Sequence, residues 1–379
     1  MAPLSGLTWD HPRGYSALAA AAAEVAPGQG LSLTWARQPL EGFESAPIAE
    51  LCAAHDLVVL DHPHVGEAVE AGCLHPLEEV FGPAELAAIG ARTIGPCLAS
   101  YRYAGRHWAL PLDAATQVMA TRPDLLETPP ATWQEVLALS RGGTPVALSL
   151  AGPHVLMSLF SVCTALGAPP ALRPQELLPP EVACTAWEIL SELAGRSPAA
   201  LRPLNPIGIL NRMAAEEIAA CVPLIYGYVT YAAPASGTAL RFSDAPRATP
   251  GGRPGGTLGG TGIGLSRRVT PTPELRTHLR WLMSEAVQRG FIPDHDGQPS
   301  ARAAWADAGV NARWRGFYAG TAATLEASCV RPRFAGYIAF QTAASERLRA
   351  ALEAREPAAR AMQALQDLYD QSRPGGTET

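Results

Sequence analysis

Charged, polar and aromatic side chains gather directly after three short apolar runs. The run Leu4–Trp9 leads into a polar segment that starts at Asp10, and the run Leu57–Leu60 leads into Asp61. Carboxylates, imidazoles and guanidinium groups at such places can bind hydroxyl or acidic groups of a small molecule. At these two loops and after a third run, residues 31–35, the residues with this chemistry are Trp9, Asp10, His11, Arg13, Arg37, Asp61, His62 and His64.

Two other chemistries use the same residue types. His11 or His62 could act as a general base with Asp61 as the orienting carboxylate, so an enzyme is an alternative interpretation. No Gly-x-Ser-x-Gly elbow or other nucleophile motif accompanies these residues. His62 and His64 flank Pro63 at a spacing that is not typical of a metal-binding pair. The sequence therefore favours binding over catalysis, and it predicts no metal site.

Composition excludes several further functions. The net charge of the 379 residues is −6, which argues against a chain-wide surface for nucleic acid. All 29 basic residues are arginine, so a P-loop and a lysine-linked pyridoxal phosphate are excluded, and no cofactor is predicted. The seven cysteines form no Cys-x-x-Cys motif. They are predicted to be mostly buried free thiols in a reducing compartment.

The elements that would position these residues alternate between strands and helices. Strands are expected at Leu4–Trp9, 31–35 and Leu57–Leu60, with helices at 15–25 and 47–55 between them. This order is typical of parallel strands joined by helices, whose ligands bind at the carboxyl ends of the strands. The loop that starts at Asp61 is therefore expected to place its side chains at an exposed sheet edge.

Later segments continue the alternation. A hairpin is expected over 100–110, after which the chain leaves at residues 111–113. Further strands are expected at 145–150 and 220–228, and a strongly helical segment at 345–369. The glycine-rich segment 259–264 lacks the Gly-x-Gly-x-x-Gly spacing, so it predicts a crossing strand and no dinucleotide loop.

Seven segments in order resemble the extracellular solute-binding proteins of ABC importers, in the family-1 group with many sugar binders. They are the N-terminal strand, loop and Ala-rich helix, and residues 56–61, 105–111, 129–137, 259–266, 297–302 and 331–337. The resemblance implies an α/β fold of two lobes, each a mainly parallel sheet flanked by helices, joined by a hinge that the chain crosses several times. It places 1–112 and 263–308 in the first lobe, and 113–262 and 309–379 in the second. The ligand would be held between the closing lobes.

The resemblance adds further ligand-binding candidates at the interface between the lobes. They are Asp113, His154, Tyr226, Tyr228, Gly260 and Thr261. Trp9 and the two tyrosines would offer flat faces to a ring, and the carboxylates would accept hydrogen bonds from hydroxyl groups. A sugar or polyol is therefore favoured, with a carboxylate or a phosphorylated compound next.

The resemblance also bears on partners and location. The chain is expected to be a monomer without enzymatic activity, with an ABC transporter permease as a candidate partner. A cytoplasmic ligand sensor is the alternative. The N-terminus has no basic segment followed by a Leu-rich core, so a cytoplasmic location is expected for the chain as given. A periplasmic location is the alternative if a leader has been removed.

Overall fold

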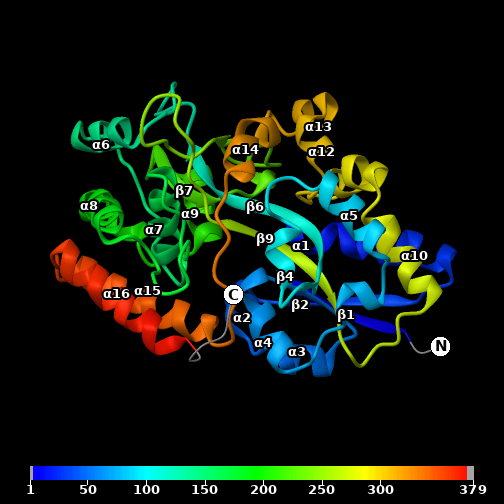
Figure 1. Cartoon of the computed structure of the whole chain (residues 1–379). Helices are drawn as coiled ribbons and strands as arrows, with labels where there is room; N and C mark the ends of the chain where they lie inside the picture. Colours follow the sequence, from blue (N-terminus) through cyan, green and yellow to red (C-terminus); the bar gives the residue numbers. More distant parts are fainter. Residues whose placement is uncertain (1–2, 374–379) are drawn as a thin grey trace.

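A mixed seven-stranded sheet passes through both lobes of the molecule (Figure 1). The computed structural model describes residues 3–373. The strands lie in the order β2-β1-β3-β9-β6-β7, and β8 pairs with β6. Their bounds are β1 Leu4–Trp9, β2 Leu33–Gln38, β3 Leu57–Leu60, β6 Leu110–Thr121, β7 Cys221–Tyr226, β8 Arg241–Ser243 and β9 Leu258–Leu265. The strands β4 Arg102–Tyr103 and β5 Arg106–His107 form a separate hairpin, as predicted.

The first three strands confirm the predicted alternation. β1 pairs in parallel with both β2 and β3. All four residues of Leu57–Leu60 are buried, as expected for a strand that is covered on both faces. The segments that follow Trp9 and Leu60 therefore leave the sheet at the same edge, which is the arrangement that the sequence predicted.

Two long strands, β6 and β9, connect the lobes (Figure 1). β6 starts beside β9 at Leu110 and ends at Thr121 beside β7 and β8. Residues 111–113 lie beyond the hairpin, as expected, and belong to β6, whose ladder with β9 shifts register between Pro111 and Asp113. Gly260 permits this close pairing. Its φ is +81°, and a Cβ there would lie 2.3 Å from the carbonyl oxygen of Asp113.

The second lobe is not built on a parallel sheet. β6 pairs antiparallel with β7, β8 and β9, so the expectation of a mainly parallel sheet in each lobe holds only for the first. The segment 145–150, expected as a strand, contributes only the parallel bridge between Val146 and Cys221. The amide of Leu148 donates to Ser197 Oγ at 3.3 Å, so it does not extend a ladder.

Helices cover both sides of the sheet (Figure 1). Those before β6 are α1 Pro12–Ala20, α2 Leu40–Ser45, α3 Ile48–Ala54, α4 Val65–Glu70 and α5 Pro83–Arg92. Those between β6 and β9 are α6 Trp133–Arg141, α7 His154–Ala165, α8 Pro180–Arg196 and α9 Pro206–Ala215. After β9 come α10 Pro273–Leu282, α11 Ile292–Asp294, α12 Arg302–Ala306, α13 Ala308–Arg313, α14 Phe317–Glu326, α15 Tyr337–Glu353 and α16 Ala358–Ser372.

The C-terminal helical segment is divided in two. Residues 345–369 span the end of α15 and most of α16. Arg355, with a φ of +51°, and Pro357 interrupt the helix between them, because both positions disfavour helical backbone. The two helices pack back on α7 and α8, and all four contribute to one apolar core. None of the helices within residues 3–373 combines the length and hydropathy that a membrane span requires.

Candidate functional site

Arg13 joins the first lobe to the second through buried contacts. It lies in the first turn of α1, where the ring of His11 caps the helix by accepting the Arg13 amide at 3.1 Å. Its Nε and Nη2 donate to the two carboxylate oxygens of Asp113 at 2.9 and 2.5 Å. Its Nη1 donates to the carbonyl oxygen of Gly227, directly after β7, at 3.1 Å. Both side chains of the ion pair are buried, so the pair is a fixed part of the interface.

Aromatic rings surround this pair. The Arg13 guanidinium lies 4.8 Å from the ring centre of Tyr228 and 5.8 Å from that of Trp9. The ring of His11 meets that of Tyr228 edge-on at 4.6 Å. Trp9 also packs against Phe43 at 5.3 Å between ring centres. Burial and the nearby Arg13 lower the pKa of His11 to about 4, so this imidazole is neutral at pH 7.

Asp61 binds a second buried arginine that the sequence analysis did not include in the site. The carboxylate contacts the guanidinium of Arg331, and Arg331 Nη1 donates to Gln341 Oε1 at 3.0 Å. Burial would raise the pKa of Asp61, but Arg331 outweighs it and holds this pKa well below its usual range. Only the resemblance pointed to residue 331, and only as part of a motif, because its partner lies 270 positions away.

The loop after β3 is buried rather than exposed. His62 and His64 form a short 3₁₀ turn around Pro63, and neither ring is accessible to solvent. His62 Nε2 accepts the backbone amide of Arg331 at 3.3 Å, and its Nδ1 lies 3.1 Å from Asp61. Burial and Arg331 lower the pKa of His62 to about 4. The expectation of an exposed loop is therefore wrong, because the segment around Arg331 covers it.

Glu44 and His154 form another contact between the lobes. Glu44 lies on α2, and His154 is the first residue of α7; its Nε2 lies 3.6 Å from Glu44 Oε1. Burial beside the Asp61 carboxylate raises the pKa of Glu44 to about 8, although Arg331 opposes this shift. Burial, with Arg331 and Arg349, lowers the pKa of His154 to about 3. At neutral pH the contact therefore joins a carboxylic acid to a neutral imidazole. The sequence analysis predicted His154 but not Glu44.

The remaining predicted residues lie in two different settings. Asp10 and Arg37 form an exposed ion pair of 2.9 Å, outside the buried cluster. Tyr226 is buried beside His154, at 5.8 Å between ring centres. Gly260 and Thr261 lie on β9 opposite Ala114 and Asp113. The structure thus gathers most predicted residues around the two arginine pairs and leaves Asp10 and Arg37 at the surface.

Several buried polar atoms in this cluster lack a hydrogen-bond partner within residues 3–373. They are Trp9 Nε1, Thr261 Oγ1, Arg331 Nε and both ring nitrogens of His64 and His154. A buried polar group without a partner costs free energy, so native proteins usually satisfy it with protein, water or ligand. A molecule that carries many hydroxyl groups could supply both donors and acceptors to these atoms.

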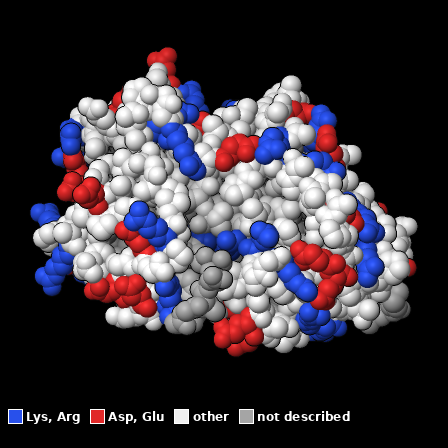
Figure 2. All heavy atoms as spheres, viewed as in Figure 1, with Lys and Arg blue, Asp and Glu red and all other residues white. Residues whose placement is uncertain are grey.

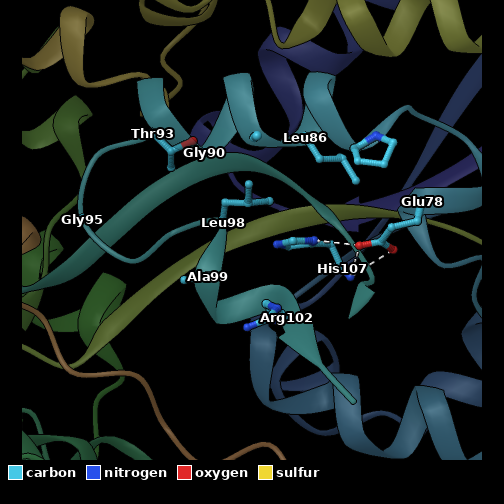
Figure 3. Close-up of a pocket in the computed structure, with 11 residues that line it drawn as sticks. Glu78, Leu86, Gly90, Thr93, Gly95, Leu98, Ala99, Arg102 and His107 are labelled. Atoms are coloured by element: carbon cyan, nitrogen blue, oxygen red, sulfur yellow. Dashed lines mark hydrogen bonds and ion pairs between the residues drawn. The ribbon is translucent and has the colours of Figure 1, made fainter. Parts of the chain in front are cut away.

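One of two cavities described here lies at this buried cluster, and the other lies apart from it. A cavity of about 20 Å³ is lined by Trp9, Arg13 and Asp113, among others. A larger pocket of about 380 Å³ lies between α5 and the β4-β5 hairpin, where His107 Nδ1 and Glu78 Oε1 are 2.9 Å apart (Figure 3). No predicted site residue lines this second pocket. Among the described residues, no group of three or more His, Cys, Asp or Glu side chains is arranged to hold a metal ion.

The fold of the chain is that of a known class of structures. No family model matches the chain. Several solved structures match it over nearly its whole length, and they establish that it has the two-lobed α/β fold of ABC transporter solute-binding proteins. The two-lobed α/β fold that the sequence resemblance implied is therefore confirmed, although the sheet of the second lobe is antiparallel.

Three of these structures illustrate the similarity. A solute-binding protein from Agrobacterium radiobacter in complex with ribitol has a TM-score of 0.80 at 20% identity, over 97% of this chain and 98% of that one. Maltose-bound MalE3 of T. maritima has a TM-score of 0.79 at 15% identity, over 97% and 99%. UgpB from Mycobacterium tuberculosis with glycerophosphocholine has a TM-score of 0.77 at 15% identity, over 98% of each chain.

Proposed function

We propose that this chain is a solute-binding protein of an ABC importer, and that it holds a small neutral sugar or polyol between its lobes. The observation that carries the proposal is the interface itself, where Arg13, Glu44 and His154 connect the lobes beside buried polar atoms without partners. The ligands named for the similar structures, ribitol, maltose and glycerophosphocholine, support a small polar solute.

The charges at the interface favour a neutral ligand over an acidic one. Arg13 is neutralised by Asp113, and Arg331 by Asp61. The lowered pKa values of His11, His62 and His154 leave these rings uncharged at pH 7. A carboxylate or phosphate would therefore find no unpaired cation among these groups. On the face shown in Figure 2, basic and acidic groups alternate over most of the surface, and a run of basic atoms crosses the central hollow.

The ligand contacts that we propose are those of the sequence analysis, extended by two residues. Glu44 and Arg331 join the predicted set, because each contacts a predicted residue from a different part of the fold. Asp10 and Arg37 would act at the rim. The lobe boundaries given above remain a prediction, with β6 and β9 as the connecting strands.

The contacts of the histidines disfavour the enzymatic alternative. Both ring nitrogens of His62 face protein groups, and Asp61 is held by Arg331. His11 Nδ1 accepts a backbone amide. A base and an orienting carboxylate engaged in this way are poorly placed to take a proton from a substrate. We propose that the chain captures its ligand without converting it.

Partner and compartment remain predictions. We propose that the chain acts as a monomer and delivers its ligand to an ABC transporter permease. We expect a cytoplasmic location, which would also suit a ligand sensor, and a periplasmic location is the alternative. The two predict that the protein expressed from the natural gene is recovered in different cell fractions. Cell fractionation with N-terminal sequencing separates the two.

A thermal-shift screen tests the proposed function. The panel should pair neutral sugars and polyols, including ribitol and maltose, with phosphorylated and carboxylate relatives of the same compounds. Ligand at about 100 times its Kd adds about 2.7 kcal/mol of stability. A shift only with neutral members supports the proposal. A shift only with charged members, or conversion of a hit into product, contradicts it.

A further inference from the structure

The pocket between α5 and the β4-β5 hairpin lies apart from the residues proposed to bind the solute. Its volume of about 380 Å³ falls within the range of about 300–1,000 Å³ for small-molecule sites. Leu86 on α5 and Leu98 line it, and both are buried. Figure 3 shows α5 along one side of the pocket, with Leu98, Ala99 and Arg102 on the other. The pocket therefore has room for a small molecule with an apolar body.

Glu78 is the only acidic residue among the described residues that line this pocket. Its Oε1 lies 3.0 Å from the amide nitrogen of His107 and 2.9 Å from Nδ1 of the same residue. Burial would raise the pKa of Glu78, but the hydrogen bonds from His107 outweigh it and lower this pKa. Glu78 is therefore ionised at pH 7 and only accepts, so Nδ1 of His107 is the donor. Both donors from the hairpin already engage this carboxylate.

Two arginines at the other side of the pocket have no carboxylate partner within residues 3–373. Arg102 lies on β4, lines the pocket and is exposed. Arg333 Nη1 donates to the carbonyl oxygens of Ala99, Ser100 and Arg102 at 3.0, 3.0 and 2.8 Å, which leaves its charge unpaired. Figure 2 shows a run of basic atoms across the central hollow, at the place of β4 in Figure 1. This side of the pocket is therefore positively charged.

We propose that this pocket binds a small carboxylate with an apolar body, of the aryl or branched-alkyl monocarboxylate class. The apolar body would lie between Leu86 and Leu98, and the carboxylate would accept hydrogen bonds from the guanidinium of Arg102. A neutral compound would not balance the charge of Arg102, and an amine would be repelled by Arg102 and Arg333. The site is separate from the proposed solute site, so either can fail without the other.

Isothermal titration of the full chain with phenylacetate tests the proposal. Phenylacetamide is the matched neutral compound, and phenethylamine is the matched cation. Phenylacetate should bind at least about tenfold more tightly than phenylacetamide, because a hydrogen bond between charged groups is lost in the amide. Phenethylamine should not bind. The proposal is overturned if phenylacetate does not bind at millimolar concentration, or if either matched compound binds equally well.

Two pairs of variants locate the bound probe. Arg102→Gln should weaken phenylacetate binding about tenfold. Arg106→Gln should leave it unchanged, because Arg106 lies on the same hairpin outside the pocket and is paired with Glu79 at 3.1 Å. Ala87→Phe on α5 fills the pocket and should abolish binding, whereas Ala88→Phe, at the next position and outside it, should not. All four substituted positions are exposed, so these variants should fold.

Equal losses within either pair of variants would overturn the proposal. Competition separates this site from the one between the lobes. The strongest neutral hit of the sugar and polyol panel should not displace phenylacetate, and displacement would place the probe between the lobes and overturn the proposal. Phenylacetate binding that follows the variant pattern, in a chain that binds no neutral solute, would support this site and contradict only the proposed function.

Discussion

Arg13 and Asp113 form a bidentate ion pair that is buried where β6 passes between the lobes, with donor–acceptor distances of 2.9 and 2.5 Å. The same guanidinium binds the carbonyl oxygen of Gly227 in the second lobe. The charge of Arg13 in the first lobe is thus neutralised by Asp113 on the connecting strand β6, and Arg13 also hydrogen-bonds the backbone of the second lobe. A ligand between the lobes would meet a pair whose charge is already balanced.

The first prediction concerns the stability of this pair. Asp113→Asn leaves the Arg13 charge buried without its counter-ion, which should lower the free energy of unfolding by about 3–5 kcal/mol. Urea unfolding of the ligand-free protein measures this loss. The double variant Arg13→Met with Asp113→Leu should lose less than the single variant, because no unpaired charge remains. Equal losses in both variants would show that packing, and not charge, dominates at this place.

A second prediction follows from the pKa of Glu44, which is raised from its ordinary 4.5 to about 8. The folded state binds this proton more tightly than the unfolded state does. The resulting stability is fully present below pH 4.5 and is lost as the pH rises through about 8. Between pH 6 and 9 the wild type should therefore lose more stability than Glu44→Gln.

Glu41→Gln on the same helix is the control for that comparison, because the exposed Glu41 side chain accepts from Asn205 at 3.0 Å outside the buried cluster. The Glu41 charge is the smallest of the influences on the pKa of Glu44, so this variant should lie closer to the wild type than to Glu44→Gln across the pH range. Parallel curves for the wild type and Glu44→Gln would contradict the account of Glu44.

The third prediction concerns Gly260 on the crossing strand. Gly260→Ala places a Cβ 2.3 Å from the Asp113 carbonyl oxygen and 2.9 Å from the Ala115 amide nitrogen. The variant should be destabilised by more than the ~1 kcal/mol typical of a residue forced into left-handed backbone. Gly72→Ala has a similar positive φ but open space around it, so it reports the backbone cost alone. Equal midpoints of thermal unfolding for both variants would refute the close approach of β6 and β9.

A local pattern was sufficient to predict the first lobe's strands and its site edge. The continuous apolar run Leu57–Leu60 and the polar residues behind it are adjacent in the sequence, so their positions in the fold follow directly. The full length of β6 could not be predicted, because Pro111 and Asp113 are residues that usually end strands. Their place in the strand depends on pairing with β9, where Gly262 lies opposite Pro111 and Thr261 opposite Asp113, about 150 positions later in the sequence.

The contacts of the site were harder to predict than its location. Asp61 was predicted from its place after an apolar run and His154 from the family resemblance, but their partners Arg331 and Glu44 come from other parts of the chain. The same limit applies to the exposure of His62 and His64. Whether a loop is covered depends on a segment that folds over it, and hydropathy along the loop carries no information about that segment.

A fourth prediction concerns ligand charge. The wild type should bind a neutral sugar or polyol more tightly than its phosphorylated relative, because both buried arginines already have carboxylate partners. Isothermal titration with the two compounds measures this preference. Tighter binding of the phosphorylated compound would contradict the account that the charges of Arg13 and Arg331 are already balanced.

The central claim, that a neutral ligand lies between the lobes, is tested most directly by titrating one compound into two histidine variants. The compound is the strongest neutral hit of the panel. His154→Ala removes a buried ring at the interface, and His107→Ala changes the separate pocket beside α5. The account predicts that His154→Ala weakens binding by about 1–3 kcal/mol, the range for a lost hydrogen-bonding partner, and that His107→Ala leaves affinity unchanged. Unchanged affinity in His154→Ala with weakened binding in His107→Ala would place the ligand in the other pocket and contradict the account.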